Sequence, residues 1–414
     1  MMKINSLYVL IIGLFLGSCQ NKEIDTKTPV IFLNPDDAST LKISDYFDGY
    51  RVLTFNNILC NTIADFAELP DKFLALAEEG HGYPRKTTIY SFNLQGDLLN
   101  AIGSIGKGPG EYISGGDEII LNRDSTVLIF DLTKYLNYTS DNKLIREWSF
   151  TQKNDKTGHL GIPVYLWNDT TILFFKNTEV LGATNSLNKG IKKSLEGTDM
   201  LNVYSIPDNQ KIHSFFSCED NFGYCLHNQL YVFQDSLCFY HEKNGYVYDV
   251  FQDRVTPRYK IDKGNYSDET TKEEFMHLKK FRGIAMHFLN ETDKYVIGIY
   301  NFGDRYYYFG YDKKSHVTKN FKLVDDDLLK TGITKSTHFP SKYFSPWHNK
   351  MQFPTDYLYF FFTPTRYAKL IEHIRSRLSE KEWEAYKEEH ADLMKIYDGL
   401  DEDSNTIILG LKFK

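Results

Sequence analysis

The sequence has few cysteines, few prolines and no excess of positive charge. Its 414 residues include 5 Cys and 12 Pro, and 48 Lys and Arg stand against 55 Asp and Glu, for a formal net charge of −7. Neither a basic tail nor a basic stripe occurs, which argues against nucleic acid and against an anionic lipid surface as partners. Because 15% of the residues are aromatic, the chain nevertheless has ample material for a hydrophobic core.

Nucleotide-binding motifs are also missing, although one glycine-rich stretch invites the comparison. The segment AIGSIGKGPGEY spans residues 101–112. A P-loop requires Ser or Thr after Gly-Lys, and a dinucleotide fingerprint requires G-x-G-x-x-G ahead of a helix. Here Gly108 follows Lys107, and the sequence after the segment reads as strand, turn and strand. We therefore interpret the segment as a structural connection between strands, with positive φ supplied by glycine and a fixed φ by proline; these residues are Gly103, Gly106, Gly108, Pro109 and Gly110. In this interpretation, Glu111 or Tyr112 faces the axis of the fold. The alternative is a mouth for an anionic ligand, lined by backbone amides and Lys107.

Motifs for metal binding and hydrolysis are absent or incomplete. We find no G-x-S-x-G nucleophile elbow and no sialidase-type Asp box. Cys218, Cys225 and His227 have the spacings C-x6-C and C-x-H, which fit no structural zinc site. The acidic stretch from Asp401 lacks the glycine and the final glutamate of a calcium loop, because Thr406 and Lys412 occupy those positions. We expect neither a metal nor a cofactor.

The N-terminus predicts export and a lipid anchor. Residues 1–18 contain Lys3 and then an apolar run too short to span a bilayer, which is typical of a signal peptide. The run ends in LGSC, similar to the lipobox of bacterial lipoproteins, so we predict cleavage before Cys19 and acylation of that residue, palmitate included. An ordinary secretory signal with a chance cysteine is the alternative. Residues 19–40 are predicted to be a flexible tether and residues 41–414 the folded domain. The remaining cysteines could form disulfides or stay free, and these are Cys60, Cys218, Cys225 and Cys238.

One template recurs along the folded domain, namely a strand with an internal aromatic residue, a turn holding Asp, Asn or Lys, and a second strand. Examples are IYSFNLQGDLLNAIG at 89–103 and LCFYHEKNGYVYDVF at 237–251. Irregular recurrence of such hairpins predicts an all-β fold of radially arranged sheets, a β-propeller. Two segments depart from the pattern, a short helix at 267–283 and two amphipathic helices at 365–400 broken near Ser379. The remaining ~320 residues make six to eight blades at roughly 40 to 50 residues each. The C-terminal NTIILGLKFK is predicted to complete a blade with strands from the other end of the chain.

Several of these stretches together resemble a known family. The lipobox at Cys19, DYFDGYRVLTFNN, DKFLALAEE, the run ending in GKGPGEY and the closing TIILGLKFK are similar to the six-bladed β-propeller lipoproteins of Bacteroidota. The resemblance implies six blades and a place in the cell envelope, and it implies no catalytic activity. It is closest in the first third of the mature chain, and the helical pair at 365–400 is larger than the family pattern requires.

Two functions follow as hypotheses. The first is a lipid-anchored, non-catalytic module of the outer membrane, on its periplasmic side, that binds an envelope protein or a small ligand such as a glycan on one face, part of which the C-terminal helices shape. The second is a hydrolase or lyase acting on a glycan or peptide in the central funnel, which would require ionisable residues converging there. Basic residues beside aromatic ones could stack on a sugar, although such aromatics more often pack in cores. The candidate ligand-binding residues are Lys107, Glu111, Tyr112, Arg305, Tyr307, Trp347, His348 and Arg366.

Overall fold

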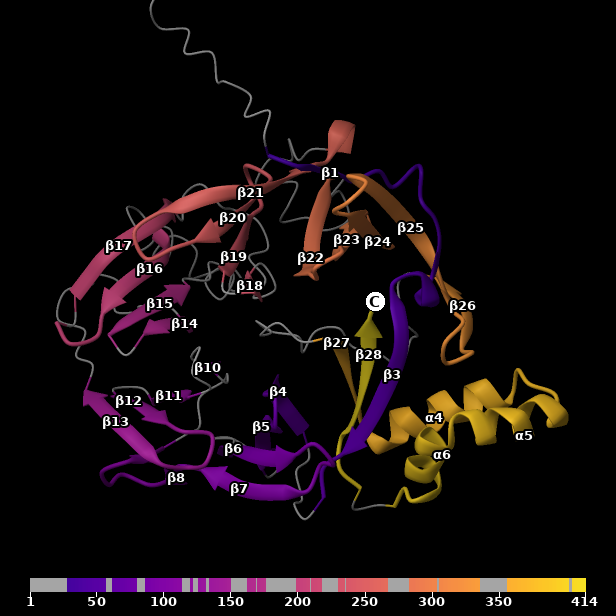
Figure 1. The fold of residues 1–414 in the computed structure, drawn as a ribbon, viewed down its shortest axis with the longest axis horizontal. Helices are drawn as coiled ribbons and strands as arrows, with labels where there is room; N and C mark the ends of the chain where they lie inside the picture. Colours follow the sequence, from indigo (N-terminus) through magenta and orange to yellow (C-terminus); the bar gives the residue numbers. More distant parts are fainter. Residues whose placement is uncertain are drawn as a thin grey trace, which may run out of the picture.

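Six sheets of the described part of the chain are arranged as the blades of a ring (Figure 1). The structure is a computed structural model, and it describes residues 28–56, 62–79, 86–113, 120–121, 126–131, 134–149, 162–168, 170–175, 199–208, 210–217, 230–234, 236–266, 283–303, 305–335, 356–401 and 404–414. The predicted all-β, six-bladed propeller is confirmed.

We number the blades 1 to 6 in chain order, and in each of blades 1 to 4 four strands form an antiparallel meander. Blade 1 contains β4 (Thr62–Glu68), β5 (Lys72–Glu79), β6 (Lys86–Asn93) and β7 (Leu98–Ile102). Blade 2 contains β10 (Ile120–Leu121), β11 (Val127–Asp131), β12 (Lys134–Tyr138) and β13 (Leu144–Ser149). Blade 3 contains β14 (Ile162–Asn168), β15 (Thr171–Phe175), β16 (Asp199–Ser205) and β17 (Gln210–Ser217). Blade 4 contains β18 (Leu230–Phe233), β19 (Ser236–His241), β20 (Tyr246–Val250) and β21 (Val255–Asp262), followed by the short 3-10 helix Gly264–Tyr266.

Blade 5 has an additional strand, and blade 6 includes strands from both ends of the chain. Blade 5 contains β22 (Ile284–Glu291), β23 (Tyr295–Phe302), β24 (Arg305–Asp312), β25 (Val317–Asp326) and the added β26 (Gly332–Lys335). The described strands of blade 6 are β27 (Tyr357–Phe362), β28 (Ile407–Phe413) and β3 (Phe47–Thr54). Because β28 lies between β27 and β3 and pairs with both, the C-terminal strand closes the ring against an N-terminal one, as the sequence predicts.

Residues 28–40 correct the predicted tether. β1 (Val30–Phe32) adds to blade 4 as a parallel neighbour of β21, and β2 (Ser39–Lys42) adds in the same way to β25 of blade 5. The short 3-10 helix Ile43–Asp45 then leads into β3. The prediction of a tether as far as residue 40 was wrong because Ile31 and Leu33 are fully buried against blades 4 and 5, so this segment is part of the folded domain.

The core consists of apolar clusters between neighbouring blades, one for each of the six contacts around the ring. β5 shows why the sequence produces this arrangement. Its residues 73–77 are all fully buried, with Phe73 in the cluster facing blade 6 and Leu74 in the cluster facing blade 2. Since successive side chains of a strand point to opposite faces, a strand apolar at every position is suited to the interior of a blade packed on both sides.

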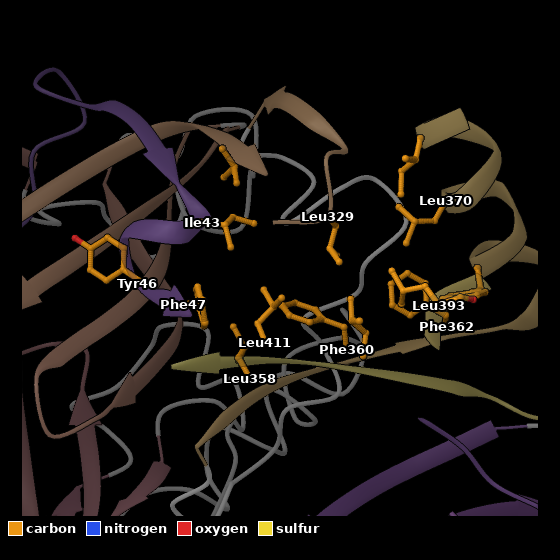
Figure 2. Packing of buried hydrophobic residues seen from close by; sticks show 14 of the residues in the cluster. Ile43, Tyr46, Phe47, Leu329, Leu358, Phe360, Phe362, Leu370, Leu393 and Leu411 are labelled. Carbon is orange, nitrogen blue, oxygen red and sulfur yellow. The ribbon is translucent and has the colours of Figure 1, made fainter. Parts of the chain in front are cut away.

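The C-terminal helical segment lies outside the ring beside β3 (Figure 1) and contains α4 (Pro364–Arg375), α5 (Glu380–Glu389) and α6 (Ala391–Asp398). The predicted break near Ser379 is present, because Ser379 and Glu382 form a capping box at the start of α5. A second break at His390 divides the remainder, where the backbone leaves helical geometry with ψ of 43°. Figure 2 shows Leu370 and Leu393 of the helices facing Phe360 and Phe362 of β27.

No helix in the described ranges is long and apolar enough to cross a membrane. The predicted helix at 267–283 lies outside the described residues except for Gly283.

Candidate functional site

The glycine-rich segment connects the last strand of blade 1 to the first strand of blade 2. β8 (Ser104–Ile105) and β9 (Glu111–Tyr112) pair in parallel within it, so the segment folds back on itself at the rim of the ring (Figure 1). Gly103 and Gly110 both have φ of +71°, the left-handed conformation that the sequence predicts for glycine here. Gly106 and Gly108 have a different role, because a Cβ atom on either would lie within 3 Å of the Glu111 carboxylate.

Glu111 and Tyr112 hold this segment closed. The amide of Gly108 donates to Glu111 Oε2 at 2.7 Å, and the Tyr112 hydroxyl donates to the Ile102 carbonyl at 3.1 Å. Of the two residues expected to face the axis, Tyr112 does not, because it is fully buried in the cluster between blades 1 and 2. Its large ring is better stabilised between two apolar sheets than in a hydrated funnel. Lys107 is exposed.

The other sequence-predicted ligand residues lie on separate elements. Arg305 is exposed at the start of β24, while Tyr307 on the same strand is buried and stacks on Tyr300 with ring centroids 5.4 Å apart. Arg366 is exposed in the first turn of α4. Trp347, His348 and Cys19 lie outside the described residues, as do Cys60, Cys218 and Cys225, while Cys238 is a buried free thiol. The described candidates do not converge on one site.

The structure instead reveals two arginine–glutamate pairs that the sequence analysis missed. In the first, Glu291 at the end of β22 accepts hydrogen bonds from Nε and Nη2 of Arg258, each at 2.8 Å. Its carboxylate also accepts the hydroxyls of Tyr259 at 2.7 Å and Tyr231 at 3.1 Å, and Lys313 Nζ lies 2.6 Å away. The Glu291 side chain has no exposed surface. Burial alone would raise the pKa of Glu291, but the hydrogen bonds and charges of Arg258 and Lys313 outweigh burial and lower it.

In the second pair, Glu68 at the end of β4 has fewer donors. Arg51 Nη2 lies 2.5 Å from Glu68 Oε1, and the Tyr359 hydroxyl donates to Oε2 at 2.6 Å. The side chains of Arg51 and Glu68 are 25% and 19% exposed. Here the effect of burial prevails over the attraction of Arg51, and the pKa of Glu68 is raised, with a further contribution from the negative charge of Asp356.

Arg51 is only partly satisfied at this second pair. Its guanidinium lies over the ring of Tyr357, 3.9 Å from the centroid. The Nε atom is buried and has no hydrogen-bond partner within the described ranges. The second pair therefore resembles the first, but it has fewer hydrogen-bond partners and its side chains are partly exposed.

The two glutamates occupy equivalent positions in their blades. Glu68 pairs with Phe73 on the next strand, and Glu291 pairs with Val296, so both are the last residue before a turn of the same length. In each case the arginine comes from the outer strand of the preceding blade, Arg51 from β3 and Arg258 from β21. The sequence signal is weak, because ELPDKF and ETDKYV mark a turn after an apolar strand without indicating which arginine each glutamate meets.

Other sites in the described part of the chain are limited. An apolar cavity of about 40 Å³ lies between blades 5 and 6, lined by residues such as Phe47, Phe288 and Leu358. The described residues contain no cluster of three or more His, Cys, Asp or Glu able to hold a metal ion.

The chain is similar to one known family and to several solved structures. A family model described as a domain of unknown function, DUF4934, matches residues 28–412. A solved structure from Bacteroides fragilis, provisionally named as an exported protein, is 18% identical with a TM-score of 0.61, and the similarity covers 93% of this chain and 99% of that one. A DUF4221 family member from Bacteroides vulgatus is 10% identical with a TM-score of 0.45, over 89% and 97% of the two chains. None of the functionally curated proteins compared with the chain matches it.

Proposed function

The chain belongs to the DUF4934 family, and we propose that it is a non-catalytic binding module of the cell envelope, anchored in the membrane through acylated Cys19. The observation that carries the binding function is the Arg51–Glu68 pair. It has the same arrangement as the buried Arg258–Glu291 pair, but the glutamate has fewer hydrogen-bond donors and both charged side chains are partly exposed. A charged pair whose hydrogen-bonding capacity is incomplete can accept further groups from a ligand or partner.

The position of the first strand limits how far the propeller could lie from an anchor at Cys19. Val30, at the start of β1, follows Cys19 by eleven positions, and even a fully extended chain of that length reaches only about 40 Å. The propeller would therefore stay close to the membrane. The provisional name of the Bacteroides fragilis neighbour, an exported protein, agrees with an envelope location. We place the anchor in the outer membrane, with the propeller on the periplasmic side.

The helices are not part of the proposed binding face. Tyr357 at the start of β27 lies beside Arg51, whereas α4 follows Phe362 at the opposite end of that strand. The C-terminal helices pack against blades 5 and 6 on the outside of the ring (Figure 1).

Replacing Cys19 tests the anchor. We expect Cys19→Ala to move most of the protein from the membrane fraction to the supernatant and to abolish incorporation of labelled palmitate, because no acyl chain can then be attached. Cys60→Ala is the matched control and should leave both measurements unchanged. A membrane fraction that is the same in Cys19→Ala and the native protein would contradict the anchor.

Crosslinking in native membranes tests the binding function. The tagged protein is crosslinked, captured and analysed by mass spectrometry, with Cys19→Ala as the control. A dominant partner that is captured only with the anchored protein supports a protein-binding module. Capture of the same proteins with anchored and unanchored forms would contradict a specific envelope partner.

A further inference from the structure

Comparison with the Arg258–Glu291 pair shows which contacts the Arg51–Glu68 pair lacks. Glu291 has contacts from Arg258, two tyrosines and Lys313, whereas Glu68 has contacts only from Arg51 and Tyr359 in the described part of the chain. The charged donor that Glu291 has and Glu68 lacks is the ammonium of Lys313. This ammonium also lies 3.9 Å from the centroid of the Phe233 ring. An ammonium is a compact charge with three donors, well suited to fill one remaining side of a carboxylate.

The strand register identifies the residue of blade 1 that stands where Lys313 does. In blade 5, Tyr295 pairs with Asp312, and Lys313 follows Asp312 directly. In blade 1, Lys72 pairs with Asn93, and Leu94 follows Asn93 directly. Leu94 has no charge and is 43% exposed. The chain therefore supplies an ammonium to Glu291 from this position and supplies none to Glu68.

The local charge also favours a cation. In the described part of the chain, the positive charge of Arg51 lowers the pKa of Glu68 and the negative charge of Asp356 raises it. Lys72, the nearest lysine in sequence, is paired with Asp141 of the neighbouring blade at 2.6 Å. A site with two carboxylates and one guanidinium attracts a positively charged group.

We propose that the Arg51–Glu68 pair binds a primary ammonium group from outside the chain, which takes beside Glu68 the place that Lys313 takes beside Glu291. This inference deepens the proposed binding function by naming the chemistry of the ligand. The ammonium belongs either to a lysine side chain of a partner protein or to a small amine. A lysine side chain and a small amine present the same ammonium group to Glu68, and carbodiimide crosslinking distinguishes these two sources.

The test uses the purified full chain and two probes of matched shape, Nα-acetyl-lysine amide and its Nε-acetylated form, which lacks the positive charge. Binding is followed by saturation-transfer NMR, which detects weak ligands of large proteins. We expect binding of the charged probe only. Glu68→Gln and Leu94→Lys should each weaken it about tenfold or more, the first by removing the acceptor charge and the second by supplying the ammonium from within the chain.

Leu99→Lys is the matched control for charge, because Leu99 is 52% exposed on β7 of the same blade. It should leave binding within about twofold of the native protein, as expected for a distant surface charge. Equal binding of the two probes, or undiminished binding by Leu94→Lys, would overturn the proposal. Since Leu94 is exposed, this variant keeps the test decisive even if Glu68→Gln fails to fold.

Carbodiimide crosslinking in native membranes then identifies the source, because it joins a carboxylate directly to a neighbouring amine. A peptide containing Glu68 joined to a lysine of another protein assigns the ammonium to that partner. Probe binding without such a crosslink assigns it to a small amine. Probe binding by the purified chain and by its variants does not depend on Cys19. If the amine site fails this test, the anchor prediction is unaffected, and if the anchor prediction fails, the amine site is unaffected.

Discussion

At the scale of single residues, the glycines of the segment 101–112 have two different causes. Gly103 and Gly110 adopt positive φ, which a glycine-rich pattern predicts from the sequence alone. Gly106 and Gly108 leave space for the carboxylate of Glu111, which follows within five residues in the chain. That second cause could not be predicted, because it depends on the segment folding back so that a side chain points at its own preceding backbone.

Gly106→Ala tests the space requirement. The new Cβ atom would lie 2.1 Å from Glu111 Oε2, so the carboxylate must move and lose the hydrogen bond from the Gly108 amide. We expect a loss of about 1 kcal/mol in the free energy of unfolding, the usual value of one such bond. Denaturant unfolding of Gly106→Ala, Glu111→Ala and the double variant measures it, and the alanine at 106 should cost little once Glu111 is absent.

Gly49→Ala is the control for that cycle, because a Cβ atom at Gly49 meets nothing within 4 Å. Its free energy of unfolding should stay within about 0.5 kcal/mol of the native value. A cost at Gly106 that is the same with and without Glu111 would show that the backbone, and not the carboxylate, requires glycine there.

At the scale of elements, the docking of the helices on blade 5 centres on the turn between β25 and β26. Lys330 in this turn lies 2.5 Å from Glu389 of α5, and the Tyr386 hydroxyl donates to the Leu329 carbonyl at 3.4 Å. The turn is itself held by buried Asp326, which accepts the Leu329 amide at 2.9 Å and the Thr331 hydroxyl at 2.7 Å. The amphipathic pattern predicts the helices, but it could not predict this turn, because the burial of Asp326 depends on how the helices and blade 5 pack together.

Asp326 makes the stability of this region depend on pH. Burial raises the pKa of Asp326 to about 6, although bonds from Thr331 and Leu329 lower it in part. A carboxyl with a raised pKa in the folded state favours folding most when it is protonated in both states, below about pH 4. This contribution is lost as the pH rises through about 6. Between pH 4.5 and 7.5 the loss amounts to about 2 kcal/mol.

Asp326→Asn tests this dependence because asparagine stays neutral. The free energy of unfolding of the variant minus that of the native protein should increase by about 2 kcal/mol from pH 4.5 to pH 7.5. Denaturant titration at both pH values measures this difference. Asp325→Asn is the control, since neighbouring residues of a strand point to opposite faces. An equal pH response of Asp326→Asn and the native chain would contradict the assignment to Asp326.

At the scale of the whole molecule, the ring could be predicted from repeated hairpins, and its charged contacts could not. A hairpin pattern shows strands, turns and an approximate number of blades, because each of these is set by local sequence. Arg51 and Glu68 belong to blades 6 and 1, and Arg258 and Glu291 to blades 4 and 5, so their meeting depends on how neighbouring sheets pack. Those predicted ligand residues that the structure describes lie on separate elements for the same reason, because proximity in sequence does not place residues on one face of a propeller.

Closure of the ring gives the final prediction. β28 is the middle strand of the three described in blade 6 and the one that joins β27, near the C-terminus, to N-terminal β3. Leu409 in β28 is fully buried, and Leu409→Ala should cost about 2 to 5 kcal/mol through the cavity that it leaves. Since β28 pairs with strands from both ends of the chain, hydrogen exchange should accelerate first in β3, β27 and β28, while blade 3 keeps its protection.

Lys412→Ala on the same strand is the control, because Lys412 is exposed and its loss removes little packing. Exchange that accelerates equally in all six blades of Leu409→Ala would mean that the ring opens only by unfolding as a whole. The pattern expected here, faster exchange confined to blade 6, would instead identify the junction of the two chain ends as the point where the propeller opens.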